Sequence, residues 1–560
     1  MEFNPGQPDP PVEEGMLRVL HVVPGVGPYQ TIQEAINEAS PGTVILIASA
    51  LYTQPIVINK PGLVLEARDS NPEVQLTCAY GPIVTVSLSE GDTCAIRGIK
   101  LIHTAASAKR IEPKGSMESE AYLDVFETNK SSEHWVKNIK VSNSMNCGLW
   151  VNGGQVLLEN SNVILSSAKN PIPGVVCSSG HLDIRNSRIK GNGEVPSVGV
   201  YVLEADLSVY RSKIYRHRGG GMVLYGSPKC NILINESKVF ENVNCGIYLL
   251  GADAKQVVQK SKVTQNEGAG IKIGHFNCSV VKGCEVTENE KGIEVQNANP
   301  FIFLNIIKSN TEEGVSFTGT EGSRCDGKCM SNDIFENENG IVCSGVSCFA
   351  KIEGNGKISN NEKAGVCVVN NAHVSIIKNE IFENQTQGVL LVKGSSAHIE
   401  RNNIFKNKKA NIAFGGCENS DTTIIENSIF QSCAEGIFNL EGGTSWIKRN
   451  SIFENADGIV LVDSHPVITM NSVYDNLRSG LTIAGYSQPN VADNEFLRNT
   501  AVGINIRDKA SGLIVRNYAI GNLVPMAVIT KTKMNLKQIK NENYIKGEIQ
   551  LPLPTLCSLL

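Results

Sequence analysis

A short aliphatic segment introduced by glycine returns about every 24 residues along most of this chain. The series consists of Gly148, Gly174, Gly199, Gly221, Gly246, Gly270, Gly292, Gly314, Gly340, Gly365, Gly388, Gly436, Gly458, Gly480 and Gly503, with Asn411 in the place between Gly388 and Gly436. A fixed period of this length is typical of a solenoid, in which each repeat stacks on its neighbours. The 560 residues are therefore predicted to share one long core rather than several globular cores.

Two series of asparagines run in step with the glycines. The first comprises Asn242, Asn266, Asn289, Asn310, Asn337, Asn361, Asn384, Asn407, Asn455, Asn476, Asn499 and Asn522; the second comprises Asn379, Asn402, Asn427, Asn450, Asn471, Asn494 and Asn517. Asparagine tolerates left-handed backbone and bonds to nearby main chain. We expect these residues to form the corners of the solenoid and to bond to one another from coil to coil.

Between the corners the segments are short and strand-like, as in the stretch from Asn450 to Asn455. Three strands and three turns fit within about 24 residues, and each coil must pair with the coils beside it. The Leu-x-x-Leu-x-Leu signature of leucine-rich repeats is missing. The predicted fold is all-β, a right-handed parallel β-helix solenoid with an N-terminal capping helix.

The ends of the repeat define the expected boundaries. Residues 1–19 are acidic and proline-rich and are predicted to be disordered, residues 20–530 to form the β-helix, and residues 531–560 to form a C-terminal cap or tail. Thr31 and Glu34 form a capping box for a short helix that Ser40-Pro-Gly42 ends. An insertion at residues 104–135 interrupts the rhythm, and regular coils begin at about residue 140.

Charge and hydropathy exclude several partners. The formal net charge of -5, with basic and acidic residues dispersed, offers no patch for nucleic acid. No apolar run approaches the ~18 residues of a membrane span, and the N-terminus lacks the pattern of a signal peptide. We expect a cytoplasmic protein without membrane insertion, with the nucleus or cilium as alternatives.

The chain resembles a known family. The segments PYQTIQEAI from Pro28 and PGTVILI from Pro41, together with Tyr52 and the recurring Asn-x-Ile-Phe-x-Asn coils, are similar to the pectin-lyase-like superfamily of right-handed parallel β-helices, in its carbohydrate-binding and sugar-hydrolase repeat branch. This branch includes polysaccharide lyases, hydrolases and epimerases, metal-delivery proteins, and F-box proteins whose β-helix recognises ubiquitination substrates. The resemblance implies the fold over roughly residues 20 to 530, and the cytosolic profile is most similar to the F-box type.

Catalysis on this fold requires carboxylates or a basic residue clustered on neighbouring coils. Glu454 and Asp475 are the best candidates, because each directly precedes a ladder asparagine on consecutive coils. Lys406 and Arg498 occupy the same register, which favours a solvated corner of mixed charge. Asp463-Ser-His465-Pro466 resembles an epimerase site in part, but a turn explains it better. We therefore predict no catalytic residue, and enzymatic activity stays open, with the balance against it.

An aromatic column is expected along consecutive coils. Phe382, Phe405, Phe430, Phe453 and Tyr474 each stand three residues after an asparagine of the second series. Inward rings would fill the core, the reading we favour, whereas outward rings would make a sticky stripe for a protein or sugar. The insertion is the other candidate for partner binding, through Lys109, Arg110, Tyr122, Phe126 and Trp135.

Sixteen cysteines are spread along the chain without a Cys-x-x-Cys motif. Cys325, Cys329, Cys343 and Cys348 come closest to a zinc site, but their spacing is irregular. Most cysteines stand among aliphatic residues, where a thiol packs as a small apolar group. No metal and no cofactor are predicted, with metal binding through Cys325 to Cys348 as a minor alternative.

These observations favour the hypothesis that the protein is a non-enzymatic intracellular scaffold or substrate-recognition module that binds protein partners. One form of this hypothesis links it to ubiquitin ligation. The first alternative is a polysaccharide-active enzyme or a carbohydrate-binding protein, so carbohydrate stays open as a partner. The second is a ciliary or cytoskeletal structural protein.

Overall fold

The computed structural model describes residues 18–69, 73–104, 147–165, 173–194, 197–417, 421–442, 444–529 and 536–551. The chain divides into two units, Met1–Glu290 and Lys291–Leu560, which are taken in turn. The described residues form about 19 parallel turns with very few helices. The prediction of an all-β parallel solenoid is confirmed.

The first unit contains two sheets, named here sheet A and sheet B, whose strands run parallel to their neighbours. Sheet A contains β1 (Val19–Val22), β2 (Val44–Ile47), β4 (Ile56–Ile58), β5 (Leu63–Ala67), β7 (Pro82–Val86), β8 (Thr93–Arg97), β10 (Cys147–Glu159), β12 (Val175–Arg185), β14 (Val198–Leu203), β15 (Asp206–Tyr210), β17 (Gly220–Tyr225), β18 (Ile232–Asn235), β20 (Cys245–Leu250), β21 (Val257–Gln259), β23 (Ala269–Gly274) and β24 (Val280–Lys282). Sheet B contains β3 (Leu51–Tyr52), β6 (Gln75–Cys78), β9 (Lys100–His103), β11 (Asn162–Leu165), β13 (Arg188–Lys190), β16 (Lys213–Tyr215), β19 (Lys238–Phe240), β22 (Lys262–Thr264) and β25 (Glu285–Thr287).

The second unit repeats this arrangement. Its sheet A strands are β26 (Ile293–Gln296), β27 (Phe301–Phe303), β29 (Glu313–Thr318), β30 (Lys328–Met330), β32 (Asn339–Ser344), β33 (Lys351–Glu353), β35 (Val366–Val369), β36 (His373–Ile377), β38 (Val389–Val392), β39 (Ser396–Glu400), β41 (Ile412–Cys417), β42 (Thr423–Ile425), β44 (Glu435–Gly442), β45 (Trp446–Lys448), β47 (Asp457–Val462), β48 (Val467–Thr469), β50 (Ser479–Ala484), β51 (Asn490–Ala492), β53 (Val502–Ile506), β54 (Leu513–Val515), β56 (Val524–Val528) and β58 (Ile549–Gln550). Its sheet B strands are β28 (Ile306–Lys308), β31 (Asp333–Phe335), β34 (Lys357–Ser359), β37 (Glu380–Phe382), β40 (Asn403–Phe405), β43 (Ser428–Phe430), β46 (Ser451–Phe453), β49 (Ser472–Tyr474), β52 (Glu495–Leu497), β55 (Tyr518–Ile520) and β57 (Tyr544–Ile545).

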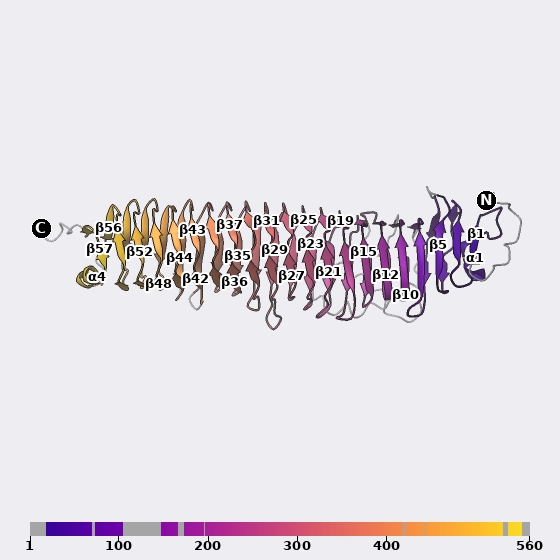
Figure 1. Ribbon diagram of the computed structural model, residues 1–560, viewed down its shortest axis with the longest axis horizontal. Helices are drawn as coiled ribbons and strands as arrows, with labels where there is room; N and C mark the ends of the chain where they lie inside the picture. The colour runs from indigo at the N-terminus through magenta and orange to yellow at the C-terminus, as the bar shows by residue number, and fades with distance from the viewer. Residues whose placement is uncertain are drawn as a thin grey trace. The chain divides into compact units, whose positions relative to one another are not determined.

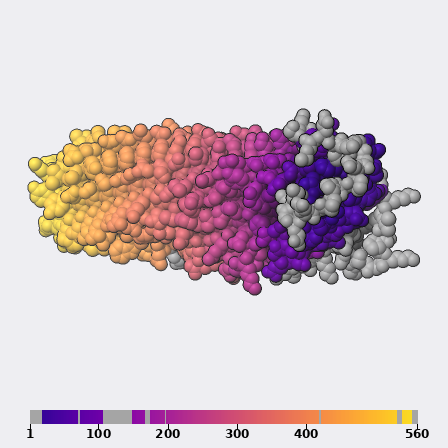
Figure 2. All heavy atoms as spheres, turned by 45° about the vertical axis from the view of Figure 1, so that its right-hand side comes forward, coloured from indigo at the N-terminus to yellow at the C-terminus, as the bar shows by residue number. Residues whose placement is uncertain are grey.

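Each regular coil consists of two sheet A strands followed by one sheet B strand. The sheet B strands are three residues long in most coils, and the middle residue points into the core. Ile429, Ile452 and Val473 are such residues, fully buried, with partly exposed neighbours on both sides. Because each coil contacts mainly the coils next to it, the coils of the second unit form adjoining bands of colour on its surface (Figure 2).

The N-terminal capping helix is present in the first unit as α1 (Ile32–Glu38). Thr31 accepts a hydrogen bond from the Glu34 amide while the Glu34 side chain accepts one from the Thr31 amide, so the predicted capping box is formed. Ile32, Ala35 and Ile36 are buried, as their spacing predicted. The helix contacts β1, β2 and β4 and covers their apolar side.

The asparagine ladders form, but the corner geometry differs from our expectation. In the second unit the Asn476 amide nitrogen donates to the Asn499 side-chain oxygen at 2.9 Å, and the Asn471 amide nitrogen donates to the Asn494 oxygen at 2.9 Å. Left-handed backbone lies one residue earlier, as at Asp475 with φ of 53°. The preceding residue therefore makes the corner, and the buried asparagine satisfies the backbone groups that the corner leaves free.

A serine ladder in the first unit escaped the sequence analysis. The backbone nitrogen of each of the first four members donates a hydrogen bond to the hydroxyl of the serine one coil later, at 3.1 Å. The members are Ser161, Ser187, Ser212, Ser237 and Ser261. Each hydroxyl also donates to the carbonyl two residues before it. In these coils serine thus forms the ladder that asparagine forms elsewhere. The regular spacing of these serines in the sequence was the signal that could have revealed the ladder.

The recurring glycines are required by close packing rather than by turns. A Cβ atom on Gly365 would lie 2.8 Å from the Asn384 amide nitrogen and 2.8 Å from the Gly388 carbonyl oxygen. Gly480 shows the same environment, with the Asn499 amide nitrogen at 2.7 Å. A ladder asparagine therefore fills the space of the missing side chain, which explains why the two series share one period.

Asn411 is the exception that follows from this rule. The ladder position on the next coil is Ser432, whose short side chain leaves room for a side chain at residue 411. The Asn411 oxygen accepts from the Asn407 amide nitrogen at 2.8 Å, and the Asn411 amide nitrogen donates to the Asn455 oxygen at 3.1 Å. Asn411 is fully buried and carries the ladder past the serine.

A double-mutant cycle tests this compensation. Asn411→Gly should remove the bridge, and Ser432→Asn should place its amide against the Asn411 side chain, so each is expected to destabilise by about 1 to 3 kcal/mol. The double variant recreates the Gly and Asn pair of the other coils and should unfold in urea close to the wild-type midpoint. If the two losses simply add, the two positions are not coupled.

Residues beyond 530 extend the second unit. The helix α4 (Leu536–Glu542) precedes β57, which pairs with β55, and β58, which pairs with β56 (Figure 1). Strands thus continue into the segment for which we expected a polar cap. Within the described ranges, no helix is long and apolar enough to cross a membrane.

Candidate functional site

The two carboxylates chosen from the sequence both belong to solvated corners. Glu454 accepts a hydrogen bond from the Gln431 side chain at 2.8 Å. Asp475 holds both oxygens against the Arg498 guanidinium, at 2.9 and 2.8 Å, and this contact raises the pKa of Arg498. Each carboxylate therefore has a partner on a neighbouring coil. The prediction that neither residue is catalytic stays untested.

The segment from Asp463 to Pro466 is held as a turn. The Asp463 oxygen accepts from the Tyr486 backbone nitrogen at 2.7 Å, and the His465 Nδ1 atom accepts from the Gln488 backbone nitrogen at 3.1 Å. Both side chains thus bond to the main chain of the next coil. These contacts agree with the turn interpretation rather than with an epimerase site.

The four cysteines considered for zinc are all fully buried in the second unit. Cys325 and Cys348 are paired neighbours on adjacent coils, and burial raises the pKa of Cys329 to about 12. Among the residues with described positions, no group of three or more His, Cys, Asp or Glu could hold a metal ion. The buried thiols instead make weak hydrogen bonds to their surroundings, as Cys329 does with the Asn332 amide nitrogen at 3.3 Å and Cys348 with the Phe317 carbonyl at 3.6 Å.

The partner-binding residues expected in the insertion, Lys109, Arg110, Tyr122, Phe126 and Trp135, lie outside the described residues.

The aromatic column points outward, contrary to the reading we favoured. Ile381, Ile404 and Ile429 take the buried places, and the following aromatic residue of each strand is only partly buried. Side chains alternate along a strand, so one residue inward puts the next outward. In the sequence, adjacent Ile and Phe residues left open which of the two points into the core. The register of the sheet B strands decides that the aromatic rings point outward.

The rings of this column cover one another's faces. From Phe382 to Tyr474 their centroids lie 4.8 to 5.0 Å apart with interplanar angles of 4 to 7°. Sugars pack on the face of an aromatic ring, and here neighbouring rings cover most of those faces. The column therefore stabilises the stack of coils and leaves little ring surface for a sugar.

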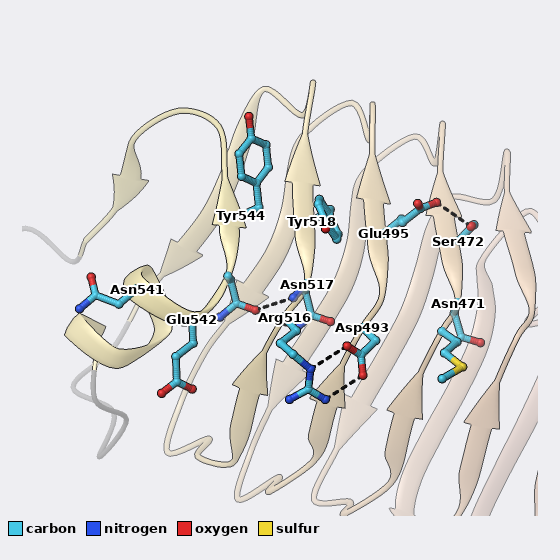
Figure 3. A pocket seen from close by; sticks show the side chains of 12 residues that line it. Asn471, Ser472, Asp493, Glu495, Arg516, Asn517, Tyr518, Asn541, Glu542 and Tyr544 are labelled. Carbon is cyan, nitrogen blue, oxygen red and sulfur yellow. Dashed lines mark hydrogen bonds and ion pairs between the residues drawn. The ribbon is translucent and has the colours of Figure 1, made fainter.

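An open groove of about 640 Å³ lies farther along the same outer face, at the last coils of the second unit (Figure 3). The outer side chains of β49, β52, β55 and β57 form its floor, and α4 contributes to one side. Its volume falls within the range of about 300 to 1,000 Å³ that ligand sites usually have. The lining residues are Met470, Asn471, Ser472, Asp493, Glu495, Arg516, Asn517, Tyr518, Asn541, Glu542, Asn543 and Tyr544.

Two tyrosines give the groove its accessible aromatic surface. Tyr518 and Tyr544 are paired in register on β55 and β57 and are 50% and 58% exposed. Their centroids are 5.8 Å apart and the rings are tilted by 44°, so their faces do not cover each other as in the column. The groove thus exposes aromatic ring faces, whereas the rings of the aromatic column cover one another.

Polar side chains border the tyrosines. Glu495 stands one coil before Tyr518 in the same register and accepts a hydrogen bond from the Ser472 hydroxyl at 2.9 Å. Arg516 donates two hydrogen bonds to Asp493, both at 2.8 Å, and this contact holds the pKa of Asp493 below its ordinary value (Figure 3). The groove therefore combines apolar ring surface with strong hydrogen-bond acceptors.

Of the groove residues, only Asn471 and Asn517 were singled out from the sequence, and both were assigned to the ladder. A signal was available: Ser472, Glu495 and Tyr518 each directly follow a ladder asparagine, so they form one column. Tyr544 follows Asn543, whose ladder role shows only in the structure, where its oxygen accepts from the Asn517 amide nitrogen at 2.9 Å.

Three solved structures illustrate what this chain is similar to. The alginate lyase AlyGC of the PL6 family has 10% identity and a TM-score of 0.31 over 92% of this chain and 98% of its own. The pectin methylesterase PemA from Erwinia chrysanthemi has 11% identity and a TM-score of 0.26 over 50% and 80%. A polygalacturonase from Erwinia carotovora ssp. carotovora has 10% identity and a TM-score of 0.23 over 78% and 95%.

The expectation of a non-enzymatic intracellular scaffold or recognition module is wrong in the light of these comparisons. The matched structures include a pectin methylesterase, an alginate lyase, alginate epimerases and a polygalacturonase. The sequence pattern led to the wrong function because the repeat reports the fold of the coils, and a fold alone does not specify a function. The narrower resemblance to the F-box type is not confirmed.

Among curated proteins no sequence matches the chain. The family model described as "Right handed beta helix region" matches residues 125–278, 234–374 and 364–524. Together these matches span well over half of the chain, and they agree with the parallel coils and their ladders. The chain belongs to this right-handed β-helix family.

Proposed function

We propose that this chain binds a polysaccharide, with the groove at β49, β52, β55, β57 and α4 as the binding site. The observation that carries the proposal is the exposed pair Tyr518 and Tyr544 beside the carboxylates that line the groove. A sugar ring has apolar C–H faces and a rim of hydroxyl groups. Tyrosine faces suit the former, and carboxylate acceptors suit the latter.

The form of the groove suits a chain rather than a single small molecule. It is open instead of enclosed, and its floor is a column of side chains at the spacing of the coils, about 4.8 Å. A polymer can lie across such a surface and extend past both ends. Carbohydrate, which the sequence left open as a partner, is therefore the ligand class that the geometry favours.

The tyrosines provide the test. Tyr518→Ala and Tyr544→Ala are each expected to weaken binding to the best ligand of a panel of soluble polysaccharides by at least about tenfold, because each removes one ring face. Affinity electrophoresis finds the ligand and isothermal titration calorimetry measures its Kd.

Tyr486→Ala is the matched control. Tyr486 is 61% exposed, belongs to the same unit and does not line the groove, so its loss should leave the Kd within about twofold. The proposal fails if the wild-type protein binds no polysaccharide of the panel, or if the control weakens binding as much as the groove variants do. Far-ultraviolet circular dichroism verifies that all variants are folded.

A further inference from the structure

The charges that line the groove are unequal. Asp493, Glu495 and Glu542 contribute three carboxylates, whereas Arg516 is the only cation among the described lining residues. Three negative charges and one positive charge leave a formal charge of -2 at the surface that a ligand would meet. Such a surface attracts hydroxyl donors and repels other carboxylates.

The single cation is already engaged. The Nε atom of Arg516 donates to one oxygen of Asp493 and a terminal nitrogen of Arg516 donates to the other, and both distances are 2.8 Å. This bidentate pair is a strong and specific arrangement for a guanidinium. A carboxylate on a ligand would have to compete with Asp493 for Arg516 while it approached Glu495 and Glu542.

A bridging cation could in principle reverse this repulsion, as it does wherever two carboxylates share a divalent ion. Such a bridge needs several ligands that converge on one point. The groove carboxylates do not converge in this way, since no metal-binding group of three or more such side chains occurs among the described residues. One Glu495 oxygen is already occupied by the Ser472 hydroxyl.

We propose that the groove selects uncharged glycans and rejects polyuronates, an inference that rests on the proposed polysaccharide binding. Glu495 and Glu542 accept hydrogen bonds from sugar hydroxyls, and Tyr518 and Tyr544 pack on the sugar faces. The same two glutamates set the specificity, because their charge is unfavourable only for an acidic sugar.

Hexasaccharides of matched length give a direct test. Cellohexaose, mannohexaose and xylohexaose represent the uncharged class, and hexagalacturonate and hexaguluronate represent the acidic class. At low salt the wild-type protein should bind at least one uncharged hexasaccharide about tenfold more tightly than either acidic one. Added sodium chloride should narrow this difference by screening the charges.

Glu495→Gln and Glu542→Gln keep the shape of the side chains and remove one charge each. Together they should tighten the binding of hexagalacturonate by about tenfold and change the binding of the best uncharged ligand much less. Glu362→Gln, which removes an exposed carboxylate of the same unit outside the groove, should change neither Kd.

The outcomes separate this inference from the function on which it rests. Preference for an uncharged ligand that the double variant erases supports it. Equal or tighter binding of an acidic hexasaccharide by the wild-type protein overturns the charge selection and leaves polysaccharide binding intact. Failure of all five ligands and of the polysaccharide panel overturns both.

Discussion

Alanine at Gly458 is expected to lower the stability of the second unit by about 3 kcal/mol or more. The added Cβ atom would lie 2.4 Å from the Gly480 carbonyl oxygen and 2.5 Å from a Val473 methyl group. The carbonyl belongs to the backbone of the next coil and cannot turn away without disturbing β50. The clash therefore cannot be relieved by a small side-chain movement. The urea midpoint of the variant measures the loss.

Gly356→Ala is the matched control for this substitution. Gly356 lies in the same unit, and the only atom near its Cβ position is an Asp333 oxygen at 3.7 Å. Alanine there should leave the midpoint close to that of the wild type. Equal midpoints for the two variants would contradict close packing as the reason for the repeated glycine.

Leucine at Asn471 should be about as damaging, with an expected loss of about 4 kcal/mol. The Asn471 amide nitrogen donates to the side chain of Asn494 and to the backbone carbonyls of Ile447 and Thr469, at 2.8 to 3.1 Å. Its oxygen accepts from the backbone and the side chain of Asn450, both at 2.9 Å. Leucine has a similar volume, but it leaves these buried groups without partners.

Asn403→Leu separates this effect from the loss of an exposed amide. Asn403 is exposed on the same sheet and bonds to Glu380 at 2.7 Å, so its replacement should cost no more than about 1 kcal/mol. Urea unfolding of both variants, followed by circular dichroism, gives the comparison. A small loss at Asn471, similar to that at Asn403, would show that the ladder contributes little to stability.

The sequence predicted the fold well because the repeat is a local signal read many times. The capping box of Thr31 and Glu34 lies within four residues, and its helix was found with its buried face. The asparagine ladders were found by their period alone. Their mechanism was not, because the left-handed residue differs from corner to corner, as Glu454, Asp475 and Arg498 show.

The groove was not found by the same reasoning. Its tyrosines and carboxylates come from three coils and from α4, and no two of the coils share a motif that marks a site. Asp493 and Arg516 become a pair because 23 residues bring the chain back to the same corner. Composition and motif spacing do not reveal such a contact. Because no site was visible in the sequence, we favoured the scaffold hypothesis.

The sequence by itself determined the length of the coil, the places of its glycines and asparagines, and the capping helix, because each depends on residue type at a fixed spacing. Only the tertiary structure decided what those residues do: Gly365 makes room for Asn384, Asn411 compensates for Ser432, and Phe405 points outward beside a buried Ile404. The physical reason is the register between coils. Side chains more than 20 residues apart meet at distances of a few ångströms, and a shift of one residue would exchange the inner and outer faces of every strand.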